Sequence, residues 1–315
     1  MVAERTQVMS PAVIVVIIVV AVAAAFGGGY AIGSMTNASN QQHHPITFVD
    51  DYNRTVSLGG YPQRIVSVAP TPTEMLFAVG AGGLIVGLDA WSDYPEQTKN
   101  ITKVGDFELN LEQIITLKPD LIVSGDLVPQ TDLDILESNG IPYMIIADRS
   151  LNDVYGSIQL VGNVTNHASN ASALVESLKD RVEAVTNKTL AGGVSHPKVY
   201  LEYWPMFTFG PGSFGDDIIR LAGGTNIGAI KDTEYPSVTD EFVVSQNPDI
   251  IVYTTGPSTT TNSTEIQARP GWNQTNAVSH LKIYSIDDNL ISRYGPRIVD
   301  GLEQLAAIIH PDLFA

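Results

Sequence analysis

Cysteine is absent from this chain, and lysine and arginine are scarce. Without cysteine the protein has no disulfide bonds, no thiolate metal sites and no acylated cysteine of the kind that anchors bacterial lipoproteins. The 17 basic residues against 34 acidic residues give a net charge of −17. This balance excludes a nucleic-acid-binding protein, since phosphate groups are bound by a basic surface.

Motifs of common enzyme classes and metal sites are also lacking. The sequence has no Gly-x-Ser-x-Gly, P-loop or His-Glu-x-x-His motif, and Gly210-Pro211-Gly212 does not space its glycines for dinucleotide binding. No metal-ligand spacing occurs among the six histidines, which are His43, His44, His167, His196, His280 and His310. We therefore expect no catalytic residue and no metal site, and interpret the protein as something other than an enzyme.

Charge is missing from a long N-terminal stretch, because residues 6–49 contain no Asp, Glu, Lys or Arg. Within it, residues 12–32 form an apolar run that as a helix would match the ~30 Å hydrocarbon thickness of a bilayer. Residues 1–33 are thus predicted to be a transmembrane anchor or a signal segment. We favour a retained anchor, although Ala23-Ala24-Ala25 offers a small-residue cleavage site. A polar linker, residues 34–45, follows.

What the chain does contain is a repeat. Residues 111–123 read LEQIITLKPDLIV and residues 240–252 read DEFVVSQNPDIIV. In each copy a residue with N-cap chemistry, Asn110 or Thr239, precedes a short amphipathic segment, Pro-Asp ends it, and a short apolar run follows. Each copy is predicted to be a helix, a turn and a buried strand.

A second match occurs between Gly82–Gly87 and Gly223–Gly228, each after an apolar helical stretch. Two copies with such a long period favour two similar α/β lobes over a solenoid. We expect a hairpin at residues 47–58 and assign residues 46–150 and 194–315 to the lobes. The interlobe region, residues 151–193, includes a predicted helix over 168–190 that would span roughly 34 Å.

With these elements in place, residues 46–312 resemble the class III solute-binding proteins of ABC importers, which deliver cobalamin, haem or iron-siderophore complexes. The segments that carry the resemblance are RIVSVAPTPTEMLFAVGAG, SDYP, LEQIITLKPDLIV, LAGGTNI, NPDIIVYTTG and RYGPRIVDGLEQLAAIIHP, and SDYP is most similar to the cobalamin-binding branch. The resemblance implies an α/β fold of two Rossmann-like lobes with mostly parallel sheets, joined by one long rigid helix. It also implies modest lobe closure on the ligand.

Further expectations from the resemblance concern partners. The chain would be a monomer when free and would deliver its ligand to an ABC permease dimer with cytoplasmic ATPase subunits. Glu74 matches a lobe-surface glutamate that docks onto permease arginines, and Asp216 or Asp217 would be the equivalent acid of the second lobe.

Loops that follow the strands are the expected ligand site, because carboxyl ends of parallel strands face the crevice in open sheets. These loops are rich in aromatic residues, which suit a bulky planar ligand decorated with amides. The candidate ligand-binding residues are Pro70, Thr71, Trp91, Ser92, Asp93, Tyr94, Asp126, Tyr203, Trp204, Phe207, Tyr235, Gly256, Arg293 and Tyr294. Cobalamin or another corrinoid is the favoured ligand. Arginine pairing with an anionic siderophore or a haem propionate leaves those ligands as alternatives.

Asn-x-Ser/Thr triplets indicate that the C-terminal part is extracellular and glycosylated, with the N-terminal helix in the cell membrane. The triplets begin at Asn37, Asn53, Asn100, Asn163, Asn170, Asn187, Asn262 and Asn273. A membrane-anchored ligand sensor built on the same lobes is the alternative function of another class.

Overall fold

The structure is a computed structural model that describes residues 45–106, 108–256 and 261–314, which belong to one structural unit. The predicted membrane segment, almost all of the linker and the sequon at Asn37 lie outside the described residues. Among the residues described, no helix is both long enough and apolar enough to cross a membrane.

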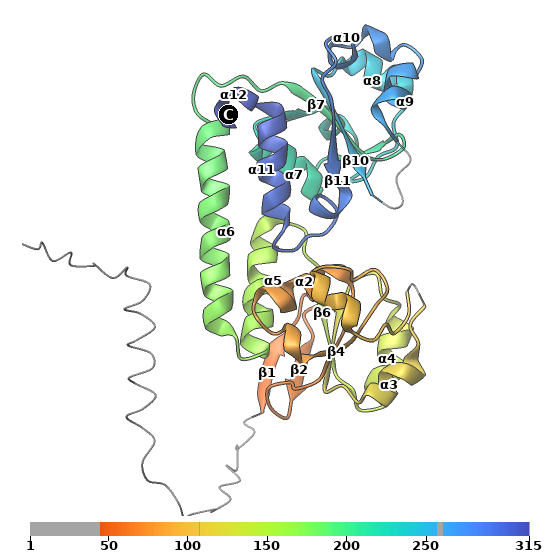
Figure 1. Ribbon diagram of the computed structural model, residues 1–315, viewed down its shortest axis with the longest axis vertical. Coiled ribbons are helices and arrows are strands. Elements are labelled where there is room, and N and C mark those ends of the chain that lie inside the picture. The colour runs from red at the N-terminus through yellow and green to blue at the C-terminus, as the bar shows by residue number, and fades with distance from the viewer. Residues whose placement is uncertain (1–44, 107, 257–260, 315) are drawn as a thin grey trace, which may run out of the picture. The chain divides into compact units, whose positions relative to one another are not determined.

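The first lobe contains a hairpin and a four-stranded parallel sheet (Figure 1). Strands β1 (Ile46–Val49) and β2 (Thr55–Leu58) pair antiparallel, which confirms the predicted hairpin. The sheet has the order β4-β3-β5-β6, from β3 (Ile65–Val68), β4 (Ile85–Leu88), β5 (Leu121–Gly125) and β6 (Tyr143–Ile146). Its helices are α2 (Pro70–Ala78), α3 (Leu111–Leu117) and α4 (Gln130–Ser138), with 3-10 turns η1 (Gly82–Leu84) and η2 (Glu96–Asn100).

The second lobe has a five-stranded sheet of order β11-β10-β7-β8, with β9 paired to β7. Its strands are β7 (Lys198–Trp204), β8 (Phe207–Thr208), β9 (Thr225–Asn226), β10 (Ile250–Thr255) and β11 (Ile283–Asp287), and only β8 runs antiparallel to its neighbour. The helices are α7 (Phe214–Leu221), α8 (Asp240–Gln246), α9 (Ser263–Ala268), α10 (Asn276–Ser279), α11 (Ile298–Ile309) and α12 (Pro311–Phe314), with 3-10 turns η3 (Ile227–Ile230), η4 (Trp272–Gln274) and η5 (Asp288–Leu290). The predicted α/β fold with mostly parallel sheets is confirmed.

Strands β3, β5, β6, β7 and β10 are buried on both faces. Successive side chains of a strand point to opposite sides, so each of these strands contributes to two cores. On β5, Leu121 and Val123 face a core shared with α2, α5, α6 and α11, whereas Ile122 faces an outer core with α3 and α4. On β7, Val199 joins the same shared core and Tyr200 faces an outer core with α8, α9 and α10. We call the shared cluster the central core.

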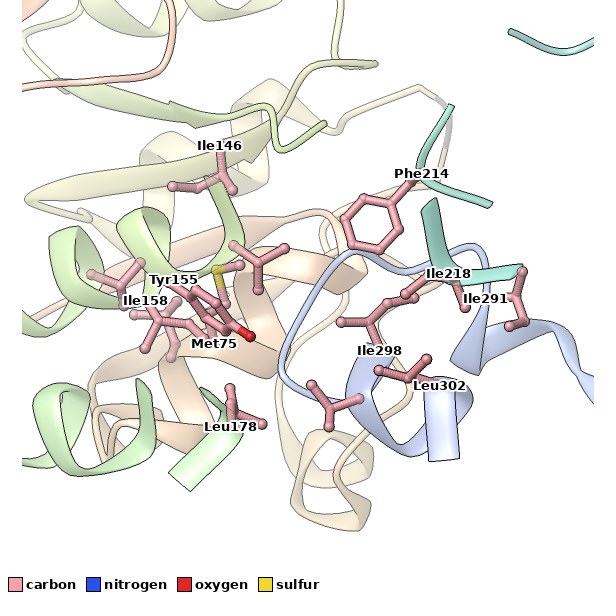
Figure 2. Packing of buried hydrophobic residues seen from close by; sticks show 14 of the residues in the cluster. Met75, Ile146, Tyr155, Ile158, Leu178, Phe214, Ile218, Ile291, Ile298 and Leu302 are labelled. Atoms are coloured by element: carbon pink, nitrogen blue, oxygen red, sulfur yellow. The ribbon is translucent and has the colours of Figure 1, made fainter. Parts of the chain in front are cut away.

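The central core is continuous between the two lobes. Figure 2 shows Met75 of α2, Ile158 of α5 and Leu178 of α6 on one side, and Ile298 and Leu302 of α11 on the other. A close-packed interior resists deformation, so a core that joins both lobes favours small relative movements over a wide hinge opening.

Two helices connect the sheets, α5 (Leu151–Val164) and α6 (Ala168–Thr189), and they pack against each other (Figure 1). Helix α6 matches the predicted helix over 168–190 and contacts α11 and α7 of the second lobe, while α5 contacts α2 of the first. The family resemblance implied one connecting helix, whereas the structure has α5 beside α6. Val154, Ile158 and Val161 of α5 pack into the central core.

Both copies of the repeat adopt the predicted helix, turn and strand, as α3 with β5 and as α8 with β10. The Asn110 side chain accepts a hydrogen bond from the backbone N–H of Gln113, and the Thr239 side chain accepts one from Phe242, so both N-caps are confirmed. Each helix ends at a left-handed residue, Lys118 or Asn247.

The aspartate of each repeat ties its strand to the strand beside it. Asp120 accepts hydrogen bonds from the backbone N–H groups of Gln63 and Arg64, next to β3, at 2.8 and 3.0 Å. Asp249 accepts one from the N–H of Lys198, at the start of β7, at 2.9 Å. The aspartate thus has the same position and the same structural role in both copies of the repeat.

The glycine match between the lobes is displaced from the one that the sequence suggested. A left-handed glycine follows α2 at Gly80, with φ of 92°, and follows α7 at Gly223, with φ of 82°. Gly223 therefore corresponds to Gly80 and not to Gly82, because the C-terminal end of a helix needs a residue that adopts positive φ without strain. Counted from these glycines, Asp217 is the counterpart of Glu74.

Candidate ligand-binding cavity

A cavity of about 550 Å³ lies between the two lobes. The wall from the first lobe consists of residues 68–71, 125–128 and 146–149, which are the ends of β3, β5 and β6 with the loops that follow. The facing wall consists of Tyr203, Phe209, Gly212, Phe214, Glu234, Tyr235, Ser292, Arg293 and Tyr294. The volume is within the range of small-molecule sites, and the position is the one expected at the carboxyl ends of parallel strands.

Aromatic rings cover the wall from the second lobe. The ring of Tyr203 lies 4.9 Å from that of Phe209 and 6.1 Å from that of Tyr235, between centroids. Phe214 stacks on Tyr294 at 4.4 Å, and the hydroxyls of Tyr235 and Tyr294 are 3.1 Å apart. Burial raises the pKa values of Tyr203 and Tyr294, so both phenols are neutral and this wall is flat, apolar and studded with hydroxyl groups.

Arg293 joins this wall to an ion-pair cluster that links the lobes. Its Nη1 lies 2.7 Å from Asp93 Oδ1 and 3.2 Å from Glu74 Oε1. Arg297, at the N-terminus of α11, donates to both carboxylate oxygens of Glu74 at 2.8 and 2.6 Å. The Arg297 guanidinium also lies over the ring of Tyr94, at 3.9 Å from its centroid. These hydrogen bonds with Glu74 raise the pKa of Arg297.

The prediction that Glu74 lies on the surface of the first lobe is wrong in this structure, because its side chain is only 2% exposed and both guanidinium groups cover it. Its counterpart Asp217 is 44% exposed at the side chain and pairs with Arg220 at 2.8 Å. Asp216 accepts a hydrogen bond from Asn226 Nδ2 at 2.8 Å and is partly buried. Of the three acids proposed for docking, Glu74 is the buried one, whereas Asp216 and Asp217 are both partly exposed.

Half of the predicted ligand-binding residues line the cavity. They are Pro70, Thr71, Asp126, Tyr203, Tyr235, Arg293 and Tyr294. The cavity wall does not include Trp91, Ser92, Asp93, Tyr94, Trp204, Phe207 or Gly256. Trp91 and Trp204 are 44% and 48% exposed, so the expectation that an indole from each lobe faces the crevice is wrong for the cavity itself.

Strand geometry explains Trp204. Tyr203 and Trp204 are successive residues of β7, so when Tyr203 points into the cavity its neighbour points to the opposite face. The loop after β4 is turned by its own hydrogen bonds. The Asp89 carboxylate accepts from the Trp91 N–H and the Ser92 hydroxyl, and Ser92 is fully buried beside Thr73 at 2.9 Å. Ser92 therefore anchors the loop and does not contact a ligand in the cavity.

The cavity wall also includes residues that were not predicted, among them Leu127, Val128, Glu234 and Ser292, and two further groups of unpredicted residues have a recognisable sequence signal. Ala147, Asp148 and Arg149 follow β6, and the rule applied to the other strands would have found them. Phe209 and Phe214 surround the start of α7, whose N-cap Ser213 accepts from the Asp216 N–H. Helix α2 is the counterpart of α7 in the first lobe, and its first residues lie on the opposite wall of the cavity. The correspondence between α2 and α7 was therefore the sequence signal that could have identified Phe209 and Phe214.

All sequon asparagines within the described residues are exposed, and none of them lines the cavity: Asn53, Asn100, Asn163, Asn170, Asn187, Asn262 and Asn273. Two of these side chains have structural partners. Asn170 donates to the Val79 carbonyl at 2.9 Å, and Asn262 caps α9 by accepting from the Glu265 N–H.

Residues 65–290 match the family described as periplasmic binding protein. The uncharacterized ABC transporter substrate-binding lipoprotein YvrC of Bacillus subtilis is 33% identical over 278 residues, 86% of this chain and 87% of that protein. A cobalamin-binding protein of Halobacterium salinarum is 28% identical over 276 residues, 84% of this chain and 74% of that protein. The structure of the periplasmic heme-binding protein RhuT of Roseiflexus sp. RS-1, in apo form, is 26% identical with a TM-score of 0.72, covering 80% of this chain and 99% of that chain.

The match covers both sheets and most of the cavity wall, while Ser292, Arg293 and Tyr294 of that wall lie just beyond its end. The chain belongs to the periplasmic binding protein family, the solute-binding proteins of ABC transporters, and is not an enzyme.

Proposed function

We propose that this substrate-binding protein captures a corrinoid, with cobalamin favoured, outside the cell and delivers it to an ABC permease dimer with its ATPase subunits. The observation that carries the proposal is the cavity itself, where a wall of aromatic rings faces a wall of loop backbone between the lobes. A large planar ligand with peripheral amides needs flat apolar area together with scattered hydrogen-bonding groups.

A corrinoid is larger than the cavity, so part of it would extend onto the surrounding loops. Arg293 connects the cavity wall to this rim, because its guanidinium contacts Asp93 and the Trp91 carbonyl. On the other side, Phe207 lies 6.3 Å from Tyr203, between ring centroids. The exposed side chains of Trp91 and Phe207 would then contact the edge of the ligand, even though they do not line the cavity.

Haem is the second candidate, because a heme-binding structure is among the relatives and tyrosine can ligate haem iron. Tyr203, Tyr235 and Tyr294 all line the cavity. A phenol must lose its proton to become a strong iron ligand, and burial, which raises the pKa values of Tyr203 and Tyr294, opposes this loss at those two residues. Ferric siderophores are a further alternative.

Isothermal titration of the full chain with cyanocobalamin, haemin and a ferric siderophore tests the proposal. We expect saturable binding of cyanocobalamin, weakened at least tenfold by Tyr235→Ala, since an aromatic contact is lost from the cavity. Tyr61→Ala is a matched control, because Tyr61 is 44% exposed against 43% for Tyr235 but does not line the cavity. Binding of haemin alone, or equal losses in both variants, would contradict the proposal. Silence with all three ligands would favour a membrane-anchored sensor.

The N-terminal apolar run is proposed to hold the binding domain at the outer surface of the cell membrane. Bacillus subtilis YvrC is named a lipoprotein, but this chain has no cysteine to carry a lipid, which leaves residues 12–32 as the anchor. Carbonate extraction of membranes should leave the full chain in the pellet and release a chain that starts at residue 34. Release of both would refute the anchor.

A further inference from the structure

We propose that Asp148 is a hydrogen-bonding group of the ligand site, which as a neutral carboxylic acid donates a hydrogen bond to an amide carbonyl oxygen of the ligand. This inference rests on the proposed function, because it places the ligand in the cavity between the lobes. It adds a determinant of specificity on the wall that has no aromatic rings.

Asp148 combines a place on the cavity wall with an incomplete set of hydrogen bonds. It follows β6 and is 8% exposed. Its Oδ1 accepts a hydrogen bond from the Ser157 hydroxyl at 2.7 Å, whereas its Oδ2 has none. Among the described residues, this Oδ2 is the one buried side-chain nitrogen or oxygen without a partner. Buried polar atoms are nearly always satisfied, and exceptions occur where a group has a functional role.

The charges around Asp148 favour its neutral form. Asp51, in the β1–β2 turn, lies 3.2 Å from the same Ser157 hydroxyl, and Asp153 of α5 and Asp126 after β5 are also near. The adjacent Arg149 is directed to Asp126, at 3.9 Å. A buried carboxyl beside other carboxylates is costly to ionise when no cation contacts it.

The second lobe does not supply the missing cation. Among the cavity residues of that lobe, Glu234 is acidic, and Arg293 is already paired with Glu74 and Asp93. Burial, reinforced by these nearby carboxylates and opposed by Ser157, raises the pKa of Asp148 to about 7. Among the described residues that line the cavity there is no histidine, and the Asp148 carboxyl has a pKa near neutral pH.

A protonated Asp148 changes what the first-lobe wall recognises. Oδ2 is shielded within the wall, so the donation requires a rotation of the carboxyl group that brings its O–H to the cavity. The O–H can then donate to a neutral carbonyl oxygen, such as that of a primary amide, without bringing a further negative charge near Asp126 and Asp51. A ligand carboxylate at the same position would be repelled by those groups. The wall therefore selects ligands that carry amides over ligands that carry carboxylates at this point.

Titration of the full chain with cyanocobalamin between pH 5.5 and pH 9, with mild detergent present, tests the inference. Wild-type affinity should be constant at low pH and fall above about pH 7, approaching tenfold per pH unit as Asp148 ionises. Asp148→Asn should remove this fall, because an amide still donates but does not ionise. Asp148→Ala should remove the fall and also weaken binding at pH 6 at least fivefold.

Asp153→Asn is the matched control, since Asp153 acts on Asp148 through charge but does not line the cavity. This variant should keep the fall in affinity and shift its midpoint to lower pH. Binding with a flat wild-type profile, or a fall that persists in Asp148→Asn, would overturn this inference alone. An absence of cyanocobalamin binding at every pH would overturn the corrinoid proposal and this inference together.

Discussion

Burial of Asp148 links the stability of the protein to pH as well as its binding. Its carboxyl has a pKa of about 7 in the folded chain against 3.8 ordinarily, so the folded state binds a proton that the unfolded state has lost. The stabilisation from this proton is complete below about pH 4 and disappears as the pH rises through 7. Above that pH the protein retains a buried carboxylate that has only one hydrogen bond.

Asp148→Asn is therefore expected to stabilise the protein increasingly between pH 5 and pH 8. From pH 5 to the folded pKa of about 7, the wild type loses stability over about two pH units, which corresponds to up to about 3 kcal/mol in the free energy of unfolding. Urea denaturation of both proteins at the two pH values measures it. A constant difference between variant and wild type would show that Asp148 does not titrate in this range.

At the scale of single elements, the two repeats depend on the aspartate that follows each helix. Asp120 and Asp249 accept hydrogen bonds from backbone N–H groups, and each joins a helix-turn-strand unit to its neighbouring strand. These N–H groups are exposed, so the loss of the acceptor costs about the net value of a hydrogen bond, about 0.5–1.5 kcal/mol.

Asp120→Ala and Asp249→Ala are each expected to lower the free energy of unfolding by about 0.5–1.5 kcal/mol. Because the sites are in different lobes, the double variant should lose the sum of the two. Asp134→Ala, at an exposed position of α4, is the control and should change stability by less than about 0.5 kcal/mol. Equal effects at all three positions, measured by urea denaturation, would refute a special role of the repeat aspartates.

At the scale of the whole binding domain, Glu74 and the central core hold the lobes together. Glu74 belongs to the first lobe, and Arg293 and Arg297 belong to the segment that leads into α11. In that segment Gly295 lies close to helix α2 of the first lobe, since a Cβ at Gly295 would be 3.7 Å from the Thr71 carbonyl oxygen. The ion pairs and the core together favour a narrow range of lobe positions.

Glu74→Gln should cost about 3–5 kcal/mol of unfolding free energy, because it leaves the partly buried guanidinium of Arg297 without its carboxylate and leaves Arg293 paired with Asp93 alone. Asp217→Asn changes the corresponding residue of the second lobe, where the pair is exposed, and should cost less than about 1 kcal/mol. Guanidinium chloride denaturation compares them. Similar costs would mean that the Glu74 cluster is no stronger than a surface ion pair.

Docking to the permease is tested at Asp217. If Asp217 contacts a permease arginine, Asp217→Lys should reduce ligand uptake at least tenfold and leave the affinity of the free protein unchanged. Uptake by whole cells and titration of the purified chain separate the two effects. Normal uptake would remove Asp217 from the docking surface, and a loss of affinity would place its effect in the binding site instead.

Much of the architecture could be predicted from local patterns. Caps at Asn110 and Thr239, Pro-Asp stops and short apolar runs are properties of neighbouring residues, so the helix-turn-strand repeats and the alternating α/β pattern followed from the sequence. The rule that a parallel sheet binds ligands beyond its carboxyl edge predicted the loops that hold Thr71, Asp126 and Tyr203, and all three residues line the cavity.

What the tertiary structure decided was the direction and environment of individual side chains. Tyr203 and Trp204 are equally plausible by composition, and only the orientation of β7 shows which ring faces the cavity. Glu74 is buried because Arg293 and Arg297, more than 200 positions away in the chain, pack against it. Contacts at such separations depend on how the two lobes pack, so local sequence patterns do not contain them.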